Sequence, residues 1–200
     1  ISACRNGHLK AVNVLLAVDG IDVNCCKDNG VTALVTACAF GNSKVVEMLL
    51  ASDDIQVNQG SIEGTTPLLI TCFHGHLEVV EMLLKVDGIQ VNQANNYGWT
   101  PLYMACWQGH LKIVNMILAV AGIQVNQADN EECTPLYMAC QNGHSKVVEK
   151  LLAVAGIQVN QADNVECTPL FMACQNGHSK IVKMLLAVDG IQVNQAKNNG

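Results

Sequence analysis

A block of seven residues that returns every 34 positions is the feature that most constrains this chain. Thr134–Cys140 reads Thr-Pro-Leu-Tyr-Met-Ala-Cys, and related blocks begin at Thr66, Thr100 and Thr168. A weaker copy begins at Thr32, so neighbouring copies are always 34 residues apart. A fixed period in this range is typical of stacked repeat proteins, in which each unit buries its apolar face against its neighbours.

The period divides the chain into units that each begin at a turn. We predict one array over residues 1–200, with five full repeats at 27–60, 61–94, 95–128, 129–162 and 163–196. A partial repeat at 1–26 precedes them, and a stub at 197–200 follows. Neither end has the polar outer face of a capping repeat, so we expect that the chain either is a fragment of a longer array or tolerates exposed ends.

Each repeat has the signals of two helices. The Thr that opens the block is a preferred helix N-cap, and all four prolines of the chain follow it at the first helical position. A glycine in constant register then ends this short helix, as Gly143 does. Residues 144–153 have the apolar spacing of an amphipathic second helix, and 157–162 lead into the next turn. The sequence therefore predicts an all-α solenoid of helix-turn-helix units, joined by β-turn or hairpin-like loops.

These motifs resemble the ankyrin repeat over the whole chain. The resemblance is carried by Thr-Pro-Leu, Gly-His, a Val-Val/Leu-Leu second helix and a Val-Asn before the turn. Ankyrin units usually have about 33 residues, so each repeat here carries one more. We place the extra residue near 153–158, where it either lengthens the second helix or widens the following loop.

The chain departs from the family pattern at two positions. The family histidine after Thr-Pro-Leu is absent, and we expect apolar packing in place of its hydrogen bond. The residues at this position are Val35, Leu69, Tyr103, Tyr137 and Phe171. The turn glycine is replaced by Glu132 and Glu166 in later repeats. If that position requires a positive φ, each glutamate carries strain of about 1 kcal/mol or more; otherwise the turn has changed type.

Cysteine is abundant, but its placement argues against a disulfide framework. Six of the ten cysteines share one register, where equivalent residues lie about 10 Å apart and too far for a disulfide. These six are Cys4, Cys38, Cys72, Cys106, Cys140 and Cys174. We interpret them as small buried apolar residues. Free thiols indicate a reducing, intracellular compartment, and we expect a cytoplasmic protein.

No residue pattern indicates catalysis or metal binding. His8, His76, His110, His144 and His178 share one register, so they cannot converge on one metal ion. The family resemblance implies that these histidines hydrogen-bond the backbone of a neighbouring loop. We therefore predict no catalytic residue, no metal site and no cofactor, and we expect that the protein is not an enzyme.

Charge and hydropathy limit the partners. A net charge of −6 argues against nucleic acid, because phosphate binding needs a basic surface. Apolar runs are far shorter than the ~18–20 residues that cross a bilayer, so we expect no membrane insertion. We expect a monomer.

Aromatic residues give the most specific functional signal. The chain has two Trp, three Tyr and three Phe, and five of these eight occupy positions that contact ligands on the concave face in the ankyrin family. Acidic residues occupy the turn tips of the later repeats. The candidate protein-binding residues are Phe40, Phe73, His74, Tyr97, Trp99, Trp107, Gln108, Glu131 and Gln141. The rings either bind a partner or only cover the groove and pack on each other.

Two functions follow from these observations. The first is a scaffold that binds a peptide or protein surface on its concave face, through a partner with an apolar anchor and basic residues. The second is a structural spacer within a larger enzyme, channel or effector. The spacer is favoured by the near-identity of 129–162 and 163–196, because identical units carry little recognition information.

Overall fold

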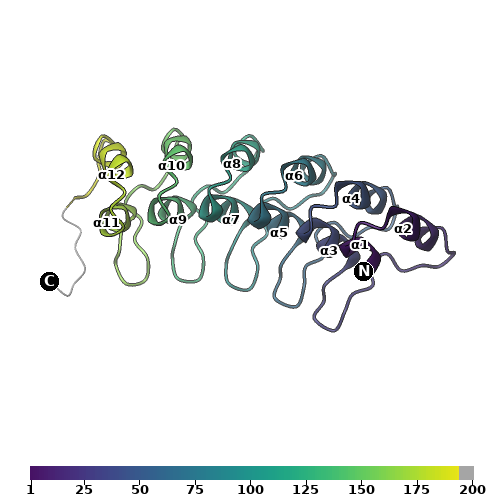
Figure 1. Ribbon diagram of the computed structural model, residues 1–200. Helices are drawn as coiled ribbons and strands as arrows, with labels where there is room; N and C mark the ends of the chain where they lie inside the picture. Colours follow the sequence, from purple (N-terminus) through teal and green to yellow (C-terminus); the bar gives the residue numbers. More distant parts are fainter. Residues whose placement is uncertain (194–200) are drawn as a thin grey trace. The chain divides into compact units, whose positions relative to one another are not determined.

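The computed structural model describes residues 1–193, and the final residues of the predicted repeat 163–196 and the stub 197–200 lie outside this range. The described chain is built from short helices joined by loops (Figure 1). The helices are α1 (Ser2–Arg5), α2 (Leu9–Leu16), α3 (Ala33–Ala39), α4 (Ser43–Leu50), α5 (Pro67–His74), α6 (Leu77–Leu84), α7 (Pro101–Gln108), α8 (Leu111–Leu118), α9 (Pro135–Gln141), α10 (Ser145–Leu152), α11 (Pro169–Gln175) and α12 (Ser179–Leu186).

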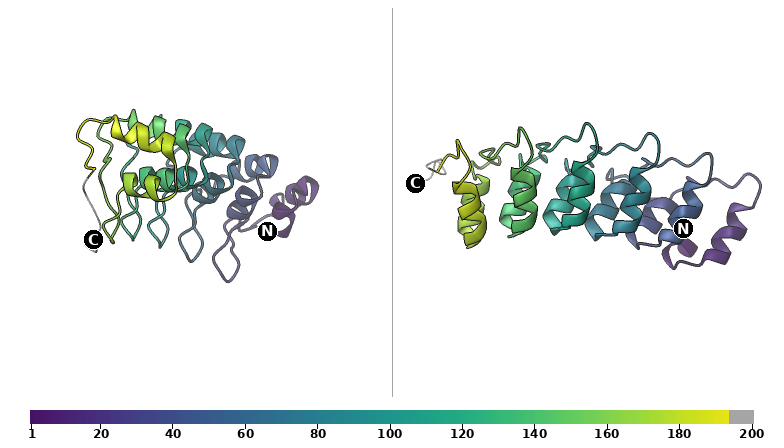
Figure 2. Two further views of the ribbon diagram at one scale, coloured as in Figure 1. Left: turned by 60° about the vertical axis from the view of Figure 1, so that its left-hand side comes forward. Right: turned by 90° about the horizontal axis from the view of Figure 1, so that it is seen from above.

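The helices form two compact units, which we call unit 1 (from Ile1 to Asn96) and unit 2 (from Tyr97 onward). Within each unit, the odd-numbered helices form one layer and the even-numbered helices form a second (Figures 1 and 2). In unit 1, α3 packs on α1, α4 and α5; in unit 2, α9 packs on α7, α10 and α11. The predicted all-α array of paired helices with a 34-residue period is confirmed. The repeat boundaries remain a prediction.

The first helix of each pair starts as the sequence predicts. The Thr134 hydroxyl accepts a hydrogen bond from the Tyr137 backbone N–H at 3.1 Å, and Pro135 is the first helical residue. The same cap occurs at Thr32, Thr66, Thr100 and Thr168. Replacing such a cap by Ala costs about 1 kcal/mol, so the repeated cap fixes where each pair from α3 onward begins. Helix α1 has no side-chain cap.

The second helices supply the apolar face that joins neighbouring repeats. Val147, Val148 and Leu151 of α10 are buried, whereas Glu149 and Lys150 are exposed. Burial of one such Leu or Val contributes roughly 1.5–3 kcal/mol. Each second helix keeps eight residues, and α10 ends at Leu152. The extra residue of the period therefore widens the loop and does not lengthen the helix.

Loops of neighbouring repeats are joined by hydrogen bonds. The Asn130 backbone N–H donates to the Tyr97 carbonyl at 3.1 Å, and the Asn164 N–H donates to the Glu131 carbonyl at 3.0 Å. On the other side of the helices, the Asn160 side chain donates to the Gly190 carbonyl and accepts from the Gln192 N–H, both at 2.9 Å. These bonds fix the hairpin loops of one repeat against those of the next.

The histidine register also connects repeats, as the family resemblance implies. Nε2 of His178 lies 3.0 Å from the Gln141 carbonyl, and Nε2 of His144 lies 2.9 Å from the Trp107 carbonyl. His76 makes the same contact with the Ala39 carbonyl at 3.1 Å. These three histidines are therefore structural, because each ring bonds to the end of the preceding repeat's first helix.

Asn42 occupies the histidine position of repeat 27–60. Its side-chain amide donates to the carbonyls of Cys4 and Arg5 at 2.7 and 2.9 Å. The contact between repeats is thus kept although the residue type has changed.

The two turn glutamates have positive φ angles. Glu132 has φ +65° and Glu166 has φ +67°, as the turn glycines of earlier repeats do. The turn has therefore not changed type, and each glutamate carries left-handed strain of about 1–3 kcal/mol.

All ten cysteines are free. Five of the six that share a register are buried, as predicted, but Cys174 is exposed. Cys140 of α9 is covered because α11 packs on α9, whereas α11 packs only on α9 and α12 among the described helices. The prediction of six buried residues is therefore wrong at Cys174. The predicted reducing, cytoplasmic compartment remains a prediction.

Candidate protein-binding surface

The predicted site residues are divided between the two units. In unit 1, Phe40 follows α3 with half of its surface exposed, and the Arg5 guanidinium lies 5.0 Å from its ring centre. Phe73 and His74 end α5, and their rings meet edge to face at 5.0 Å. These three residues present aromatic surface in unit 1.

In unit 2, the aromatic side chains cluster around Trp99. The exposed Tyr97 ring stacks on Trp99 at 4.8 Å, and Trp107 of α7 meets Trp99 edge to face at 5.5 Å. Tyr103 lies 6.4 Å from Trp99 and 6.2 Å from Trp107. Such pairs are worth about 0.5–1.5 kcal/mol each beyond burial, so the cluster is a fixed platform. Gln108 is exposed at the end of α7.

A pocket of about 290 Å³ lies beside this platform, and we call it the aromatic pocket. Tyr97, Trp99 and Tyr103 contribute aromatic surface. The turn residues and α9 complete the lining, with Asp129, Asn130, Glu131, Cys133, Tyr137, Met138, Gln141 and Asp163. Four predicted residues therefore share one cavity: Tyr97, Trp99, Glu131 and Gln141. Trp107 does not line the cavity but supports Trp99 from the side.

The two tyrosines at the family histidine position hydrogen-bond to aspartates. The Tyr103 hydroxyl donates to Asp129 Oδ2 at 2.8 Å, and the Tyr137 hydroxyl donates to Asp163 Oδ2 at 2.7 Å. We expected apolar packing alone to replace the hydrogen bond of the family histidine at this position. At both tyrosines this expectation is wrong, because each side chain makes a hydrogen bond of its own. Each phenol is long enough to reach the turn 26 residues later. Burial raises the pKa of Tyr103 and of Tyr137, and the bonded carboxylate raises each pKa further.

The aromatic pocket carries uncompensated negative charge. Asp129 Oδ1 accepts from the backbone N–H groups of Glu131 and Cys133, at 3.0 and 2.9 Å. These donors and the Tyr103 hydroxyl are neutral. None of the Lys or Arg side chains in residues 1–193 lines the pocket or forms an ion pair with Asp129, Glu131 or Asp163.

Cys133 also lines the pocket, but it is not an activated nucleophile. Burial raises the pKa of its thiol to about 12, and the charges of Asp129, Asp163 and Glu131 contribute to the increase. The thiol is therefore protonated near neutral pH. Nucleophilic cysteines need the opposite environment, which lowers the pKa.

The tyrosine–aspartate bond predicts a measurable coupling. Tyr137→Phe should lower the free energy of unfolding by about 1–2 kcal/mol, because a hydrogen bond to a carboxylate is lost. Urea denaturation followed by tryptophan fluorescence measures this change. In an Asp163→Ala background, which has no side-chain acceptor for the Tyr137 hydroxyl, the same substitution should cost much less. Equal costs in the two backgrounds would show that the bond contributes no stability.

Unit 1 has a pocket at the corresponding place in its repeats. It has a volume of about 430 Å³ and is lined by Val31, Val35, Ala39, Ile62 and Ile70, among others. Ile62 is 69% exposed, which is unusual for a large aliphatic side chain. The pocket of unit 1 thus keeps one carboxylate, Glu63, but has no aromatic side chain in its lining, whereas the pocket of unit 2 is both aromatic and acidic.

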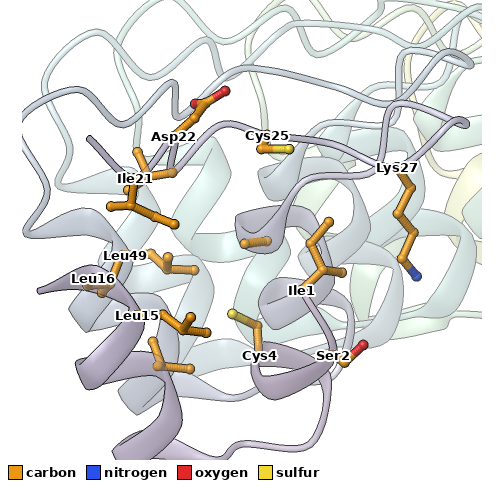
Figure 3. Close-up of a pocket in the computed structure, with 13 residues that line it drawn as sticks. Ile1, Ser2, Cys4, Leu15, Leu16, Ile21, Asp22, Cys25, Lys27 and Leu49 are labelled. Carbon is orange, nitrogen blue, oxygen red and sulfur yellow. The ribbon is translucent and has the colours of Figure 1, made fainter. Parts of the chain in front are cut away.

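A third pocket, of about 470 Å³, lies between the first helices of unit 1. Cys4, Leu15 and Leu49 line it, together with Asp22 and Lys27 of the loop between α2 and α3 (Figure 3). Leu15 is 48% exposed, whereas its register equivalent Leu49 is buried by α2.

The sequence predicted the aromatic positions around Trp99 but not the hydrogen bonds of Tyr103 and Tyr137. Both side chains are buried, in agreement with the expected apolar packing, and their hydroxyls in addition join the pocket to the next turn. The sequence does contain a signal for these hydrogen bonds, because each of the two tyrosines is followed 26 residues later by an aspartate. Leu69, one repeat earlier, has Asn95 at that distance and no hydroxyl to donate.

Within the part of the chain that the structure describes, no group of three or more His, Cys, Asp or Glu side chains is placed to hold a metal ion. No helix among residues 1–193 is both long and apolar enough to cross a membrane.

Comparison with known proteins agrees with the repeat pattern and the paired helices. The family described as "Ankyrin repeats (3 copies)" matches residues 1–61, 54–129 and 120–197. A comparison with curated proteins gave no match. Ankyrin repeats are generally protein–protein interaction modules, and the matches cover nearly the whole chain. The chain therefore belongs to the ankyrin-repeat family.

Proposed function

We propose that the chain is a non-enzymatic protein-binding module that holds a peptide or protein surface at the aromatic pocket, on its concave face. The observation that carries the proposal is the stacking of the exposed Tyr97 on the half-buried Trp99 at a cavity. Tyr97 keeps 47% of its surface exposed. Tyr and Trp are the residue types that dominate binding hot spots, and rings already fixed by stacking lose little entropy on binding.

The chemistry of the two units favours a mixed partner. Carboxylates in the aromatic pocket attract basic residues, whereas Ile62 and its neighbours in unit 1 suit an apolar side chain. This supports the expectation of a partner with an apolar anchor and basic residues. Phe40, Phe73, His74 and Gln108 are proposed as additional contact residues outside the aromatic pocket.

The alternative is a spacer without a ligand of its own, and one observation favours it. Repeats 129–162 and 163–196 differ at only six positions. The differences are Glu131/Val165, Tyr137/Phe171, Val147/Ile181, Glu149/Lys183, Lys150/Met184 and Ala155/Asp189. However, Glu131 and Tyr137 line the aromatic pocket, so two of the few differences affect the proposed binding site.

The proposal is tested by selecting binders from a random peptide library with the 200-residue chain and with its Trp99→Ala variant. Selected peptides should bind Trp99→Ala at least about 30-fold more weakly, because a hot-spot residue contributes about 2 kcal/mol or more. Tyr97→Ala should weaken binding as well, and its exposed ring makes loss of folding a minor concern.

Val165→Ala is the matched control, because Val165 is an exposed turn-tip residue of the next repeat. It should leave the affinity unchanged. If no peptide is enriched, or if the selected peptides bind all variants equally, the proposal is wrong and the spacer is favoured.

A further inference from the structure

We infer that the aromatic pocket receives an arginine side chain of the partner, with the guanidinium stacked on aromatic rings and paired with carboxylates. This inference rests on the proposed function and specifies the chemistry of its site. The pocket volume of about 290 Å³ is at the lower end of the ~300–1,000 Å³ range of small-molecule sites. A cavity of this size suits one long side chain.

The lining of the pocket determines the sign of the ligand's charge. Asp129, Glu131 and Asp163 contribute three carboxylates, and no basic side chain in the described chain lies among them. The Glu131 side chain is exposed, so it can reach a bound ligand. Phosphate groups and acidic peptides would be repelled, whereas a cation would be attracted and desolvated only in part.

The aromatic surface favours arginine over lysine. A cation gains energy within about 6 Å of a Trp or Tyr ring centre, and the planar guanidinium also stacks on the ring. Tyr97 and Trp99 offer two rings that already lie nearly parallel, at 28°. The guanidinium has five N–H donors in a rigid fork, so it can pair with Glu131 while it donates to a second acceptor such as Asp129. An ammonium group has three donors and no flat face.

The combination of aromatic rings and acidic groups is specific to this place in the chain. In the next repeat, Val165 replaces Glu131 and Phe171 replaces Tyr137. In unit 1, Glu63 keeps the carboxylate of Glu131, but Val35 and Ile62 occupy the positions of Tyr103 and Asn130, and no aromatic side chain lines that pocket. The arginine site is therefore confined to unit 2, in the turns of 95–128 and 129–162 together with Asp163 of the following turn.

The probe is the peptide acetyl-Gly-Gly-Arg-Gly-Gly-amide, compared with the same peptide containing lysine or citrulline. Citrulline keeps the shape of arginine but has no charge. Binding is followed by NMR of the indole N–H of Trp99, assigned with a Trp107→Phe variant. The arginine peptide should shift this resonance saturably below about 10 mM. The lysine peptide should bind about 3-fold more weakly, and the citrulline peptide about 10-fold more weakly.

Two charge variants provide the matched comparison. Glu131→Gln should weaken arginine binding about 3-fold, because Glu131 lines the pocket. Glu132→Gln removes the same charge from an exposed neighbour that does not line the pocket, and it should change the affinity little.

The inference is overturned if the arginine peptide causes no saturable shift, if citrulline binds equally well, or if the two glutamate variants behave alike. These outcomes separate the inference from the proposed function. Library peptides that need Trp99 but tolerate citrulline in place of arginine would disprove the arginine site and leave the protein-binding module intact. If neither the library nor the probe binds, both proposals fail.

Discussion

Gly143→Ala is expected to lower the free energy of unfolding of unit 2 by about 3 kcal/mol. Gly143 has φ +78°, a left-handed conformation that costs an alanine about 1–2 kcal/mol. An added Cβ would also lie 2.6 Å from Cε1 and 2.8 Å from Nδ1 of His178. The His178 ring would have to move, and its 3.0 Å bond to the Gln141 carbonyl would be lost at about 1–2 kcal/mol.

The chain offers a matched control at Gly177. This glycine is one repeat later and has φ +72°, but its added Cβ would meet no atom within 4 Å among the described residues. Gly177→Ala should therefore cost only about 1–2 kcal/mol, from backbone strain. Urea denaturation followed by fluorescence reports on unit 2, because Trp99 and Trp107 both belong to it. Equal losses for the two variants would show that the close approach of the histidine ring has no energetic role.

Gly98→Ala is expected to cost about 3 kcal/mol as well, for a different reason. Gly98 has φ +82°, and an added Cβ would lie 2.7 Å from the Asp129 Cα and 2.8 Å from the Asn130 N. These are backbone atoms of the next hairpin loop, so they cannot rotate away as a side chain can. Moving that loop would weaken the 3.1 Å bond between the Asn130 N–H and the Tyr97 carbonyl.

A substitution in the opposite direction, from glutamate to glycine at a turn position with positive φ, should increase stability instead of lowering it. Glu132 occupies the equivalent turn position with φ +65°. Glu132→Gly should raise the free energy of unfolding by about 1 kcal/mol, because strain is relieved while the unfolded chain gains some freedom. Destabilisation by Glu132→Gly would mean that the glutamate side chain makes contacts that outweigh its backbone strain.

The predictions from the sequence are correct for features that depend on residues close together in the chain. Thr134 and Pro135 specify a helix start by their own hydrogen bonding and ring geometry, so the helix boundaries followed from the sequence. The role of His178 followed from its register and from the family resemblance. These signals recur in several repeats, and recurrence distinguishes them from chance.

The errors concern side chains that meet across repeats. Tyr137 is buried as expected, but the hydrogen bond from its hydroxyl to Asp163 was not predicted. Cys174 shares the register of Cys140, but no described helix covers it as α11 covers Cys140. The direction of a side chain and its covering neighbour depend on how repeats stack, and single-residue preferences do not contain this information.

The sequence by itself determined the repeat length, the helix pairs, their caps and the family, because each depends on residues a few positions apart within one 34-residue unit. Only the tertiary structure decided which residues form the aromatic pocket. Trp99 comes from one turn, Glu131 from the next and Asp163 from a third, and all three line one cavity. Stacking of the repeats brings these turns together, because buried apolar faces and hydrogen bonds between loops fix their register. The charge and aromatic character of the cavity are therefore properties of the fold as well as of the residues.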